Sequence, residues 1–351
     1  MDTLFSLVNK RNCIHPFSWL MGVIFLSILI ALVWSGINSK ENEPLHLVVY
    51  AFSTQEEVLN QGIFPVFKQA WEEDTGKEVV IEGVFGPSGT LAGQILLGAQ
   101  ADIAIFSNQR YIEWLKFNKC VDKDTNQVMI ASSPLVILTR PGNPKGISNF
   151  KDLAQPGIQL IHADPGSSGA GEWSLLAEYG SVYMETGDHQ LAESQLKDIW
   201  HNVRLVGSSS RTSLTLFELG TGDALITYEQ DALLAQERGA AIDINLPQPT
   251  ILTRHYAVIV NDNVSYVERP LAEAFLAFIQ GNEGQQILHQ YYFRTATSEG
   301  ELLSTLVQPF TEEDLGGWAQ AYNKIIENSW KTEIEPGLDL EPATSFLVRG
   351  E

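Results

Sequence analysis

Basic residues are scarce in this sequence of 351 residues. It carries 22 Lys and Arg residues against 43 Asp and Glu residues, which gives a formal net charge of −21 at pH 7. Nucleic acids and anionic membrane surfaces are bound by basic patches, so this balance argues against either as a partner. The composition is globular, with 44% hydrophobic and 19% charged residues, and the chain is long enough for two lobes.

Cysteine is almost absent. Only Cys13 and Cys120 occur, and Cys13 precedes the long apolar run, so the part after that run has one cysteine and no internal disulfide. The seven histidines show no spacing typical of metal ligands, and the sequence has no phosphate loop of the Walker type. We therefore expect neither a bound metal nor a cofactor.

The one long apolar run lies near the N-terminus. Residues 17–34 read FSWLMGVIFLSILIALVW and follow Lys10 and Arg11. A run of this length is typical either of a secretory signal or of a helix that spans a bilayer. We interpret residues 1–44 as a cytoplasmic flank followed by a signal peptide or membrane anchor. The positive flank stays inside, so we expect the rest of the chain in the periplasm or on the outer face of the cytoplasmic membrane.

Strand and helix patterns alternate after residue 44. LHLVVYAF, KEVVIEGVF and ADIAIFS read as strands with helical patterns between them, and this order predicts a mostly parallel sheet flanked by helices. The same alternation repeats downstream, so we predict an α/β protein of two lobes, each with such a sheet, and a ligand cleft between them. We expect the first part of lobe 1 at residues 45–131 and lobe 2 at 132–248. The chain then returns to lobe 1 and forms C-terminal helices at 249–330, and an acidic tail follows at 331–351.

Small hydroxyl residues occupy four predicted junctions between a strand and the next helix. Two of them lie in GPSGT, residues 86–90, and GSSGAG, residues 166–171; the four are Ser53, Ser88, Ser168 and Ser210. Ser53 and Glu56 also have the spacing of a capping box. Any one serine could be an ordinary helix cap. Helix starts carry unpaired backbone N–H groups that attract anions, so two junctions from each half predict an anion site in the cleft.

Longer stretches around these junctions resemble the periplasmic substrate-binding proteins of sulfate and molybdate ABC transporters. Those similar to the sulfate branch read NPKGISNFKDLAQPGIQLIHADPGSSGAGEWSLLAEYG, SSSRTSLTLFELGTGDALITYEQDALLA, GNEGQQILHQYYFR and FTEEDLGGWAQAY. SGTLAGQILLGAQADIAIFSNQRYIEWL is more similar to the molybdate branch. The resemblance implies a type 2 periplasmic binding fold and an oxyanion held by neutral donors. It also implies delivery of the anion to the permease subunits of an ABC transporter.

The resemblance also implies which residues bind the anion. Ser88 would give its hydroxyl and its backbone N–H, and Ser210 a backbone N–H. Ser168, Gly169 and Ala170 stand where the family has a Ser-Gly-Gly loop, whose N–H groups face the oxyanion. The first strand ends near a further donor at Ser53, with the register open by one or two residues.

Two positions depart from the sulfate pattern. Tyr228 stands where sulfate binders usually have an indole donor, and molybdate binders use a tyrosine there. Ala170 replaces the second glycine of the loop. We expect sulfate or a close relative as the ligand, with molybdate or tungstate as the alternative.

Two other classes of function stay open from the sequence. A serine hydrolase would use Ser88 or Ser168 with His162 and Asp164, but neither serine lies in a G-x-S-x-G motif, so we expect no enzyme. A membrane-anchored oxyanion sensor would need an uncleaved N-terminal segment, through which the protein would also contact the membrane.

Overall fold

The computed structural model describes residue 27 and residues 44–295 and 306–338. The chain divides into two compact units, Met1–Leu45 and His46–Glu351, and nearly all described residues belong to the second. No helix among these described residues is both long and apolar enough to cross a bilayer. Except for Ser27, the apolar run at 17–34 lies outside them.

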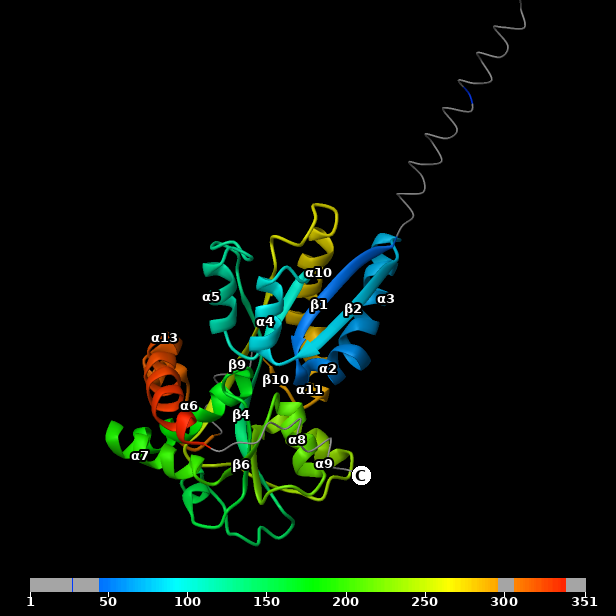
Figure 1. Ribbon diagram of the computed structural model, residues 1–351. Helices are drawn as coiled ribbons and strands as arrows, with labels where there is room; N and C mark the ends of the chain where they lie inside the picture. The colour runs from blue at the N-terminus through cyan, green and yellow to red at the C-terminus, as the bar shows by residue number, and fades with distance from the viewer. Residues whose placement is uncertain (1–26, 28–43, 296–305, 339–351) are drawn as a thin grey trace, which may run out of the picture. The chain divides into compact units, whose positions relative to one another are not determined.

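Strands and helices alternate through most of the described chain (Figure 1). In chain order they are β1 (Leu45–Phe52), η1 (Ser53–Gln55), α2 (Glu56–Val58), η2 (Leu59–Ile63), α3 (Phe64–Thr75), β2 (Val79–Gly86), α4 (Ser88–Leu96), β3 (Ile103–Phe106), α5 (Arg110–Phe117), β4 (Val128–Thr139), η3 (Phe150–Ala154), β5 (Leu160–Ala163), α6 (Gly169–Thr186), α7 (His189–Trp200), β6 (Val203–Gly207), α8 (Ser210–Glu218), β7 (Ala224–Tyr228), α9 (Glu229–Glu237), β8 (Asp243–Asn245), β9 (Thr250–Ile259), α10 (Arg269–Gln280), α11 (Asn282–Gln290), β10 (Arg294–Thr295), β11 (Pro309–Phe310), η5 (Glu312–Leu315), α13 (Gly317–Ala321), η6 (Tyr322–Ile334) and η7 (Glu335–Gly337).

One set of elements, here called lobe 1, is built on β2, β1 and β3, which are neighbours in that order. β1 and β3 run parallel, with Val49 opposite Ile103. Helices α4 and α5 pack on one face through a buried cluster that includes Phe106. Helices α3 and α10 meet through Phe67 and Phe275, whose ring centroids lie 5.1 Å apart, and they lie on the other side of the strands from α4 and α5 (Figure 1).

The second set, lobe 2, is built on β7, β5 and β6, which are parallel neighbours. Helices α8 and α9 bury Phe217 and Ala232 against Ile161 and Leu225. Helices α6 and α7 add a second buried layer, in which the ring of Trp200 packs 4.5 Å from that of His162. Both lobes therefore expose the carboxyl ends of parallel strands, where helices begin.

Strands β4 and β9 connect the two lobes. The first half of β4 pairs antiparallel with β9 and its second half, from Leu135 to Thr139, pairs antiparallel with β7. β9 continues into lobe 1, where it pairs antiparallel with β3. The predicted α/β fold with two lobes is confirmed, and its antiparallel pairs are those made by the connecting strands.

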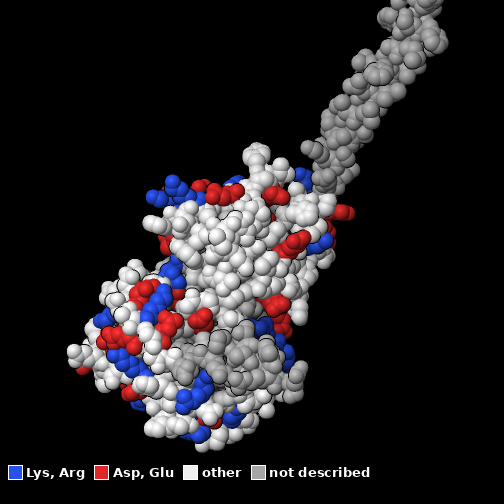
Figure 2. Space-filling model, in the orientation of Figure 1, with Lys and Arg blue, Asp and Glu red and all other residues white. Residues whose placement is uncertain are grey.

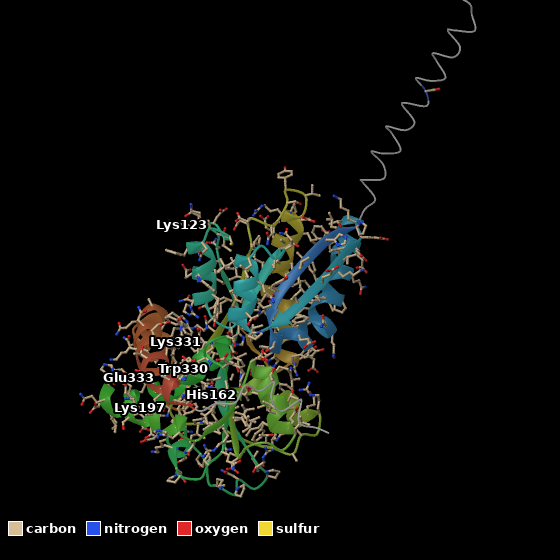
Figure 3. The ribbon with its side chains drawn as sticks, viewed as in Figure 1. Lys123, His162, Lys197, Trp330, Lys331 and Glu333 are labelled. Atoms are coloured by element: carbon tan, nitrogen blue, oxygen red, sulfur yellow. The ribbon has the colours of Figure 1, made fainter. Side chains whose placement is uncertain are left out.

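The C-terminal helices lie against lobe 2. Helix η6 reaches Ile334, which places its last four residues inside the stretch 331–351 that was expected to form a tail. Lys331 donates to Tyr322 and Glu327, and Lys197 of α7 pairs with Glu333 (Figure 3). Trp330 is 2% exposed and packs on Trp200, so burial and ion pairs hold this helix in place. The rest of the expected tail, from residue 339, lies outside the described residues.

Candidate functional site

The predicted serine junctions lie at the carboxyl ends of strands in both lobes. β1 ends before Ser53, and Ser88 begins α4 after the extended residue Pro87. In lobe 2, Ser168 is the N-cap of α6 and Ser210 is the first residue of α8. The capping box predicted for Ser53 does not form, because the chain turns at once into the short helix η1 and its N-cap, Phe52, has no side-chain cap.

Ser88 is 1% exposed and bonds to a serine that the sequence did not single out. Its Oγ accepts a hydrogen bond from the backbone N–H of Ser107 at 3.2 Å, and the two hydroxyl oxygens are 3.1 Å apart. Ser107 follows β3, so the pair joins two neighbouring strand ends of lobe 1. The N–H of Gly89 donates to the carbonyl of Ser167 at 2.9 Å, and this bond crosses from lobe 1 to lobe 2.

Glycine is required where the lobes touch. A Cβ atom at Gly89 would lie 2.7 Å from the Ser167 carbonyl oxygen, and one at Gly169 would lie 1.9 Å from the Ser107 hydroxyl. Real Cβ atoms do not approach other atoms this closely, so a larger residue at either position would push the lobes apart. The structure therefore brings predicted site residues from both lobes together at Ser107.

The lobe 2 hydroxyls already have partners. The Ser168 hydroxyl accepts the N–H of Ala170 at 3.3 Å, so the Ala170 N–H, one of the predicted donors, is engaged by a helix cap. The Ser210 hydroxyl donates to Asp231 at 2.9 Å and lies 3.1 Å from Thr227 Oγ1. The Ser210 proton is thus engaged by Asp231 and the Ser168 backbone N–H by the Asp164 carbonyl at 2.8 Å, whereas the Ser168 hydroxyl accepts here and keeps its own proton.

Tyr228, the last residue of β7, is fully buried. Its ring packs against Phe52 and His255 at centroid distances of 6.1 and 5.3 Å. Within the described residues its hydroxyl has no hydrogen-bond partner. Burial raises the pKa of Tyr228, and the Ser107 hydroxyl nearby lowers it in part, so the phenol stays protonated and can donate.

Side-chain amides also end at the strand ends without partners. Among the described residues, both polar atoms of Gln55 and of Gln230 are buried and unpaired, as are Thr54 Oγ1 and Asn108 Oδ1. These four side chains are at most 1% exposed. An unpaired buried polar group costs about 1 to 3 kcal/mol and is rare, so a cluster of them indicates a ligand site. In the sequence, these side chains could have been found as polar residues that closely follow a strand. They lie in STQ (53–55), SN (107–108) and YEQ (228–230).

Glu172 in the first turn of α6 links the lobes on one side of the site. It is 1% exposed, forms an ion pair with Arg110 of α5, and accepts a hydrogen bond from Asn108 at 2.9 Å. The Arg110 guanidinium lies 4.5 Å from the ring centroid of Tyr111 and 4.1 Å from that of Tyr322. Next to Glu172, Trp173 Nε1 donates to the Ser107 carbonyl at 2.8 Å.

A second set of ion pairs spans the lobes elsewhere. Arg238 at the end of α9 pairs with Glu57 of α2, and Arg294 of β10 pairs with Glu229 at 2.8 and 3.0 Å. The fully buried Asp231 lies behind Ser210; burial raises the pKa of Asp231 to about 6, although the Arg211 guanidinium lowers it. Opposite charges thus hold the lobes together around the unpaired donors.

The residues of the hydrolase alternative are used otherwise. His162 Nδ1 lies 2.6 Å from the Ala163 carbonyl and its Nε2 lies 3.3 Å from Glu178, while Asp164 accepts from Gly166 and Ser167. Within the described residues, no group of three or more His, Cys, Asp or Glu side chains could hold a metal ion.

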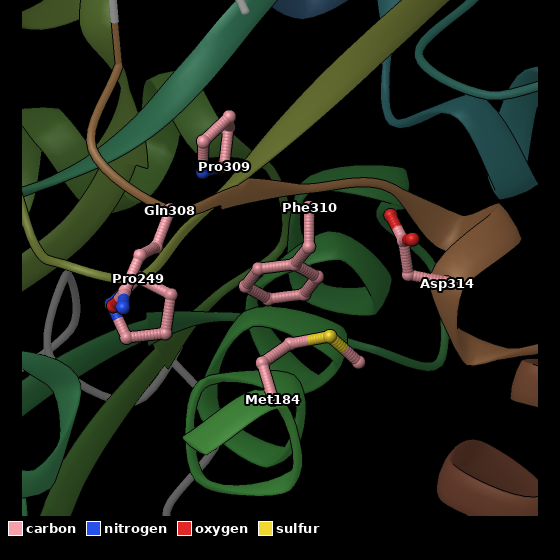
Figure 4. Close-up of a pocket in the computed structure, with 6 residues that line it drawn as sticks. All are labelled: Met184, Pro249, Gln308, Pro309, Phe310 and Asp314. Carbon is pink, nitrogen blue, oxygen red and sulfur yellow. The ribbon is translucent and has the colours of Figure 1, made fainter.

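A separate pocket of about 220 Å³ lies between α6 and β11 (Figure 4). It is lined by Met184, Pro249, Gln308, Pro309, Phe310 and Asp314. None of the predicted site residues lines it, and Asp314, its only charged residue, would repel an anion.

Comparison with known proteins points to one family. Residues 47–294 match the family model described as bacterial extracellular solute-binding protein. The sulfate-binding protein of Synechococcus elongatus is 29% identical over 306 residues, covering 84% of this chain and 87% of the relative. That of Salmonella typhimurium is 31% identical over 277 residues, covering 75% and 84%. The solved structure of the sulfate-binding protein SubI from Mycobacterium tuberculosis H37Rv superposes with a TM-score of 0.73 at 26% identity, covering 80% of this chain and 99% of that chain.

Proposed function

Because the chain belongs to the family of bacterial extracellular solute-binding proteins, we propose that it captures sulfate or a related tetrahedral oxyanion for an ABC importer. The two relatives and the solved structure that resemble it over most of its length are named as sulfate-binding proteins. The proposal agrees with the resemblance read from the sequence and adds the geometry of this chain.

The observation that carries the proposal is the set of buried polar atoms without partners at the strand ends. The donors among them are Thr54 Oγ1 and Gln55 Nε2 from lobe 1 and Tyr228 Oη and Gln230 Nε2 from lobe 2. They lie beside the starts of η1, α4, α6, α8 and α9, whose first N–H groups have no partner inside the helix. An oxyanion bound here would satisfy several of these donors at once.

Neutral donors are sufficient for useful affinity. Hydrogen bonds to a charged group contribute about 1.5 to 3 kcal/mol each, and each helix start adds roughly 0.3 to 1 kcal/mol. Micromolar binding requires roughly −8 kcal/mol. Five or six such bonds toward the upper end of this range leave this value after the cost of desolvating the anion and closing the lobes. We propose Ser53, Ser88, Ser168, Gly169, Ala170, Ser210 and Tyr228 as site residues, together with Thr54, Gln55, Ser107 and Gln230.

Tyr228 favours a second candidate ligand, molybdate or tungstate. Its buried hydroxyl has no partner within the described residues and faces the Ser107 side of the site. A phenol is what the resemblance implies for molybdate binders. The names of the relatives favour sulfate, so sulfate stays first.

We place the protein in the periplasm or on the outer face of the cytoplasmic membrane. The apolar run at residues 17–34 supports export, either as a signal peptide or as an anchor. The permease subunits of an ABC transporter would then be its partners, and a membrane-anchored oxyanion sensor is the alternative role. We propose no catalytic activity, since His162 lies against Ala163 and Glu178 and Asp164 accepts from Gly166 and Ser167, so neither activates Ser88 or Ser168.

Calorimetry of residues 45–351 with sulfate, thiosulfate, molybdate and phosphate tests the function and ranks the ligands. We expect sulfate to bind most tightly, and EDTA to leave its affinity unchanged. Binding of none of the four anions, or loss of binding with EDTA, would contradict the proposal.

Tyr228 substitutions sharpen the choice of ligand. Tyr228→Phe keeps the ring and removes the donor, so we expect affinity to fall by about 1 to 3 kcal/mol. Tyr228→Trp offers a longer donor and should shift preference toward sulfate over molybdate. Unchanged affinity for both anions in the Phe variant would remove Tyr228 from the site.

A further inference from the structure

Exposed apolar side chains gather at the end of lobe 1 that lies away from the site. Leu97, Phe117 and Tyr266 are 91%, 83% and 93% exposed, and Trp114 and Val267 accompany them. The described residues contain nine exposed large hydrophobic side chains, and these five come from one end of one lobe. Single exposed apolar residues are ordinary, but a group of them marks an interaction surface.

Hydrogen bonds between three turns show that these residues share one surface. Asn263 donates to the carbonyls of Ala99 and Ala101, and Asn261 accepts from Thr125 and from the N–H of Asp122. The turns after α4, after α5 and after β9 therefore meet. We call this surface, residues 97–101, 114–125 and 260–267, the turn surface of lobe 1.

The chain enters lobe 1 at the turn surface. Asp102 Oδ2 accepts the N–H of Val48 at 2.7 Å, so the start of β1 lies beside the start of β3. Residues 35–44 alone separate β1 from the apolar run at 17–34, and ten residues span at most about 35 Å. A bilayer that held this run would therefore lie within reach of the turn surface.

The charge of the turn surface also suits a lipid surface. It contains three lysines, Lys116, Lys119 and Lys123, against three aspartates, whereas the whole chain carries a net charge of −21. Figure 2 shows basic and acidic residues side by side at the α5 end of lobe 1, next to an area without charged residues, and Figure 3 labels Lys123 there. Aromatic rings with neighbouring lysines are typical of the boundary between membrane and water.

We propose that the turn surface of lobe 1 binds the surface of the lipid bilayer. Phe117, Leu97 and Tyr266 enter the headgroup region, and the lysines contact the phosphates. The contact holds the protein close to the membrane and leaves the anion site, at the opposite ends of the same strands, accessible. The proposal does not depend on which anion is bound.

The test uses the full chain in phosphatidylcholine vesicles that contain brominated lipid, with Cys13 and Cys120 replaced by serine. A fluorophore is attached at Tyr266→Cys or, as a control on lobe 2, at Leu219→Cys, which is 78% exposed in the wild type. We expect the lipid to quench the first label at least threefold more than the second. Equal quenching of the two labels, both in these vesicles and in vesicles with added phosphatidylglycerol, would overturn the proposal.

Substitutions on the turn surface give the matched comparison. The double variant Leu97→Asp/Phe117→Asp should abolish the excess quenching of the label at position 266. The control is the double variant Leu191→Asp/Leu219→Asp with the same label at 266, which should keep the excess quenching. Unchanged sulfate affinity and circular dichroism show that each variant folds. An effect that appears only when phosphatidylglycerol is added assigns the contact to the lysines and still supports a lipid surface. A dimer in detergent that Phe117→Asp dissociates would assign the surface to a second copy of the chain and overturn the proposal.

Discussion

Lobe 1 and lobe 2 reach the candidate site with different side chains. In lobe 1, Thr54, Gln55 and Asn108 end there with polar atoms that have no partner within the described residues. In lobe 2, two buried carboxylates, Glu172 and Asp231, occupy the first turns of α6 and α9. A carboxylate at a helix start lies in the favourable field that an anionic ligand would also use.

This difference shows why the lobes depend on each other. Arg110 of lobe 1 compensates the charge of Glu172 in lobe 2. The charge of Asp231 is instead favoured by Arg211, which belongs to lobe 2 itself and lowers the pKa of Asp231. Without Arg110, the α6 helix start would present a buried negative charge to an incoming anion. Lobe 2 therefore becomes suitable for an anion once lobe 1 is closed on it.

Removal of the Glu172 charge should have the largest effect on this dependence. Glu172→Gln leaves the Arg110 guanidinium buried without its counter-charge, which costs about 3 to 5 kcal/mol of the free energy of unfolding. Because the pair spans the lobes, we also expect sulfate affinity to fall. Urea unfolding and calorimetry measure the two quantities.

Glu312→Gln is the matched control, because Glu312 forms a similarly buried pair with Arg254 away from the cleft. It should lower stability and leave the affinity for sulfate unchanged. If both variants lost the same affinity, the Arg110–Glu172 pair would have no special role in closing the lobes.

The pH dependence of the free energy of unfolding tests the role of Asp231, the second of the two buried carboxylates. Its pKa rises from 3.8 to about 6 on folding, so the folded state holds the proton more tightly than the unfolded state between these values. The free energy of unfolding should therefore decrease by about 2 kcal/mol as pH rises from 4 to 6, out of about 3 kcal/mol over the whole titration. Urea unfolding at several pH values should show that Asp231→Asn removes this part of the slope. A slope that is the same in both proteins would refute the assignment to Asp231.

The sequence predicted the strand ends and the serines well, because parallel strands and small hydroxyl residues leave local signals. It did not predict Gln55 and Gln230, since a glutamine after a strand also suits an exposed loop. The pair of Arg110 and Glu172 joins residues 62 positions apart, and no local pattern reveals such a contact. The alternation of strand and helix patterns was enough to predict the fold, whereas the partners of the buried polar groups could be identified only from the packed structure.

Ser88→Ala, a change in lobe 1, should have the next largest effect on the affinity for the anion. It removes a hydroxyl that can donate to the anion and keeps the start of α4, so we expect affinity to fall by about 1.5 to 3 kcal/mol, or roughly ten- to a hundredfold. Calorimetry with sulfate measures this change. Ser181→Ala is the control, because Ser181 is also buried and donates to the carbonyl of Glu178 inside α6. Loss of affinity in the control but not in Ser88→Ala would place the donor elsewhere.

Ser168→Ala should have the smallest effect, because at this loop we expect backbone N–H groups, and not the hydroxyl, to bind the anion. It caps the N–H of Ala170, so its removal should cost about 1 kcal/mol of the free energy of unfolding. The backbone N–H groups at the α6 start remain, and Ala170 gains a free donor, so we expect sulfate affinity to change by less than about threefold, under 1 kcal/mol. Gly169→Ala, by contrast, would place a Cβ atom 1.9 Å from the Ser107 hydroxyl and keep the lobes from closing. Calorimetry of both variants therefore separates the contribution of the hydroxyl from that of the helix backbone. A large loss of affinity in Ser168→Ala would mean that the Ser168 hydroxyl, and not the helix backbone, binds the anion. Lobe 2 would then bind the anion through a side-chain hydroxyl, as we expect of Ser88 in lobe 1.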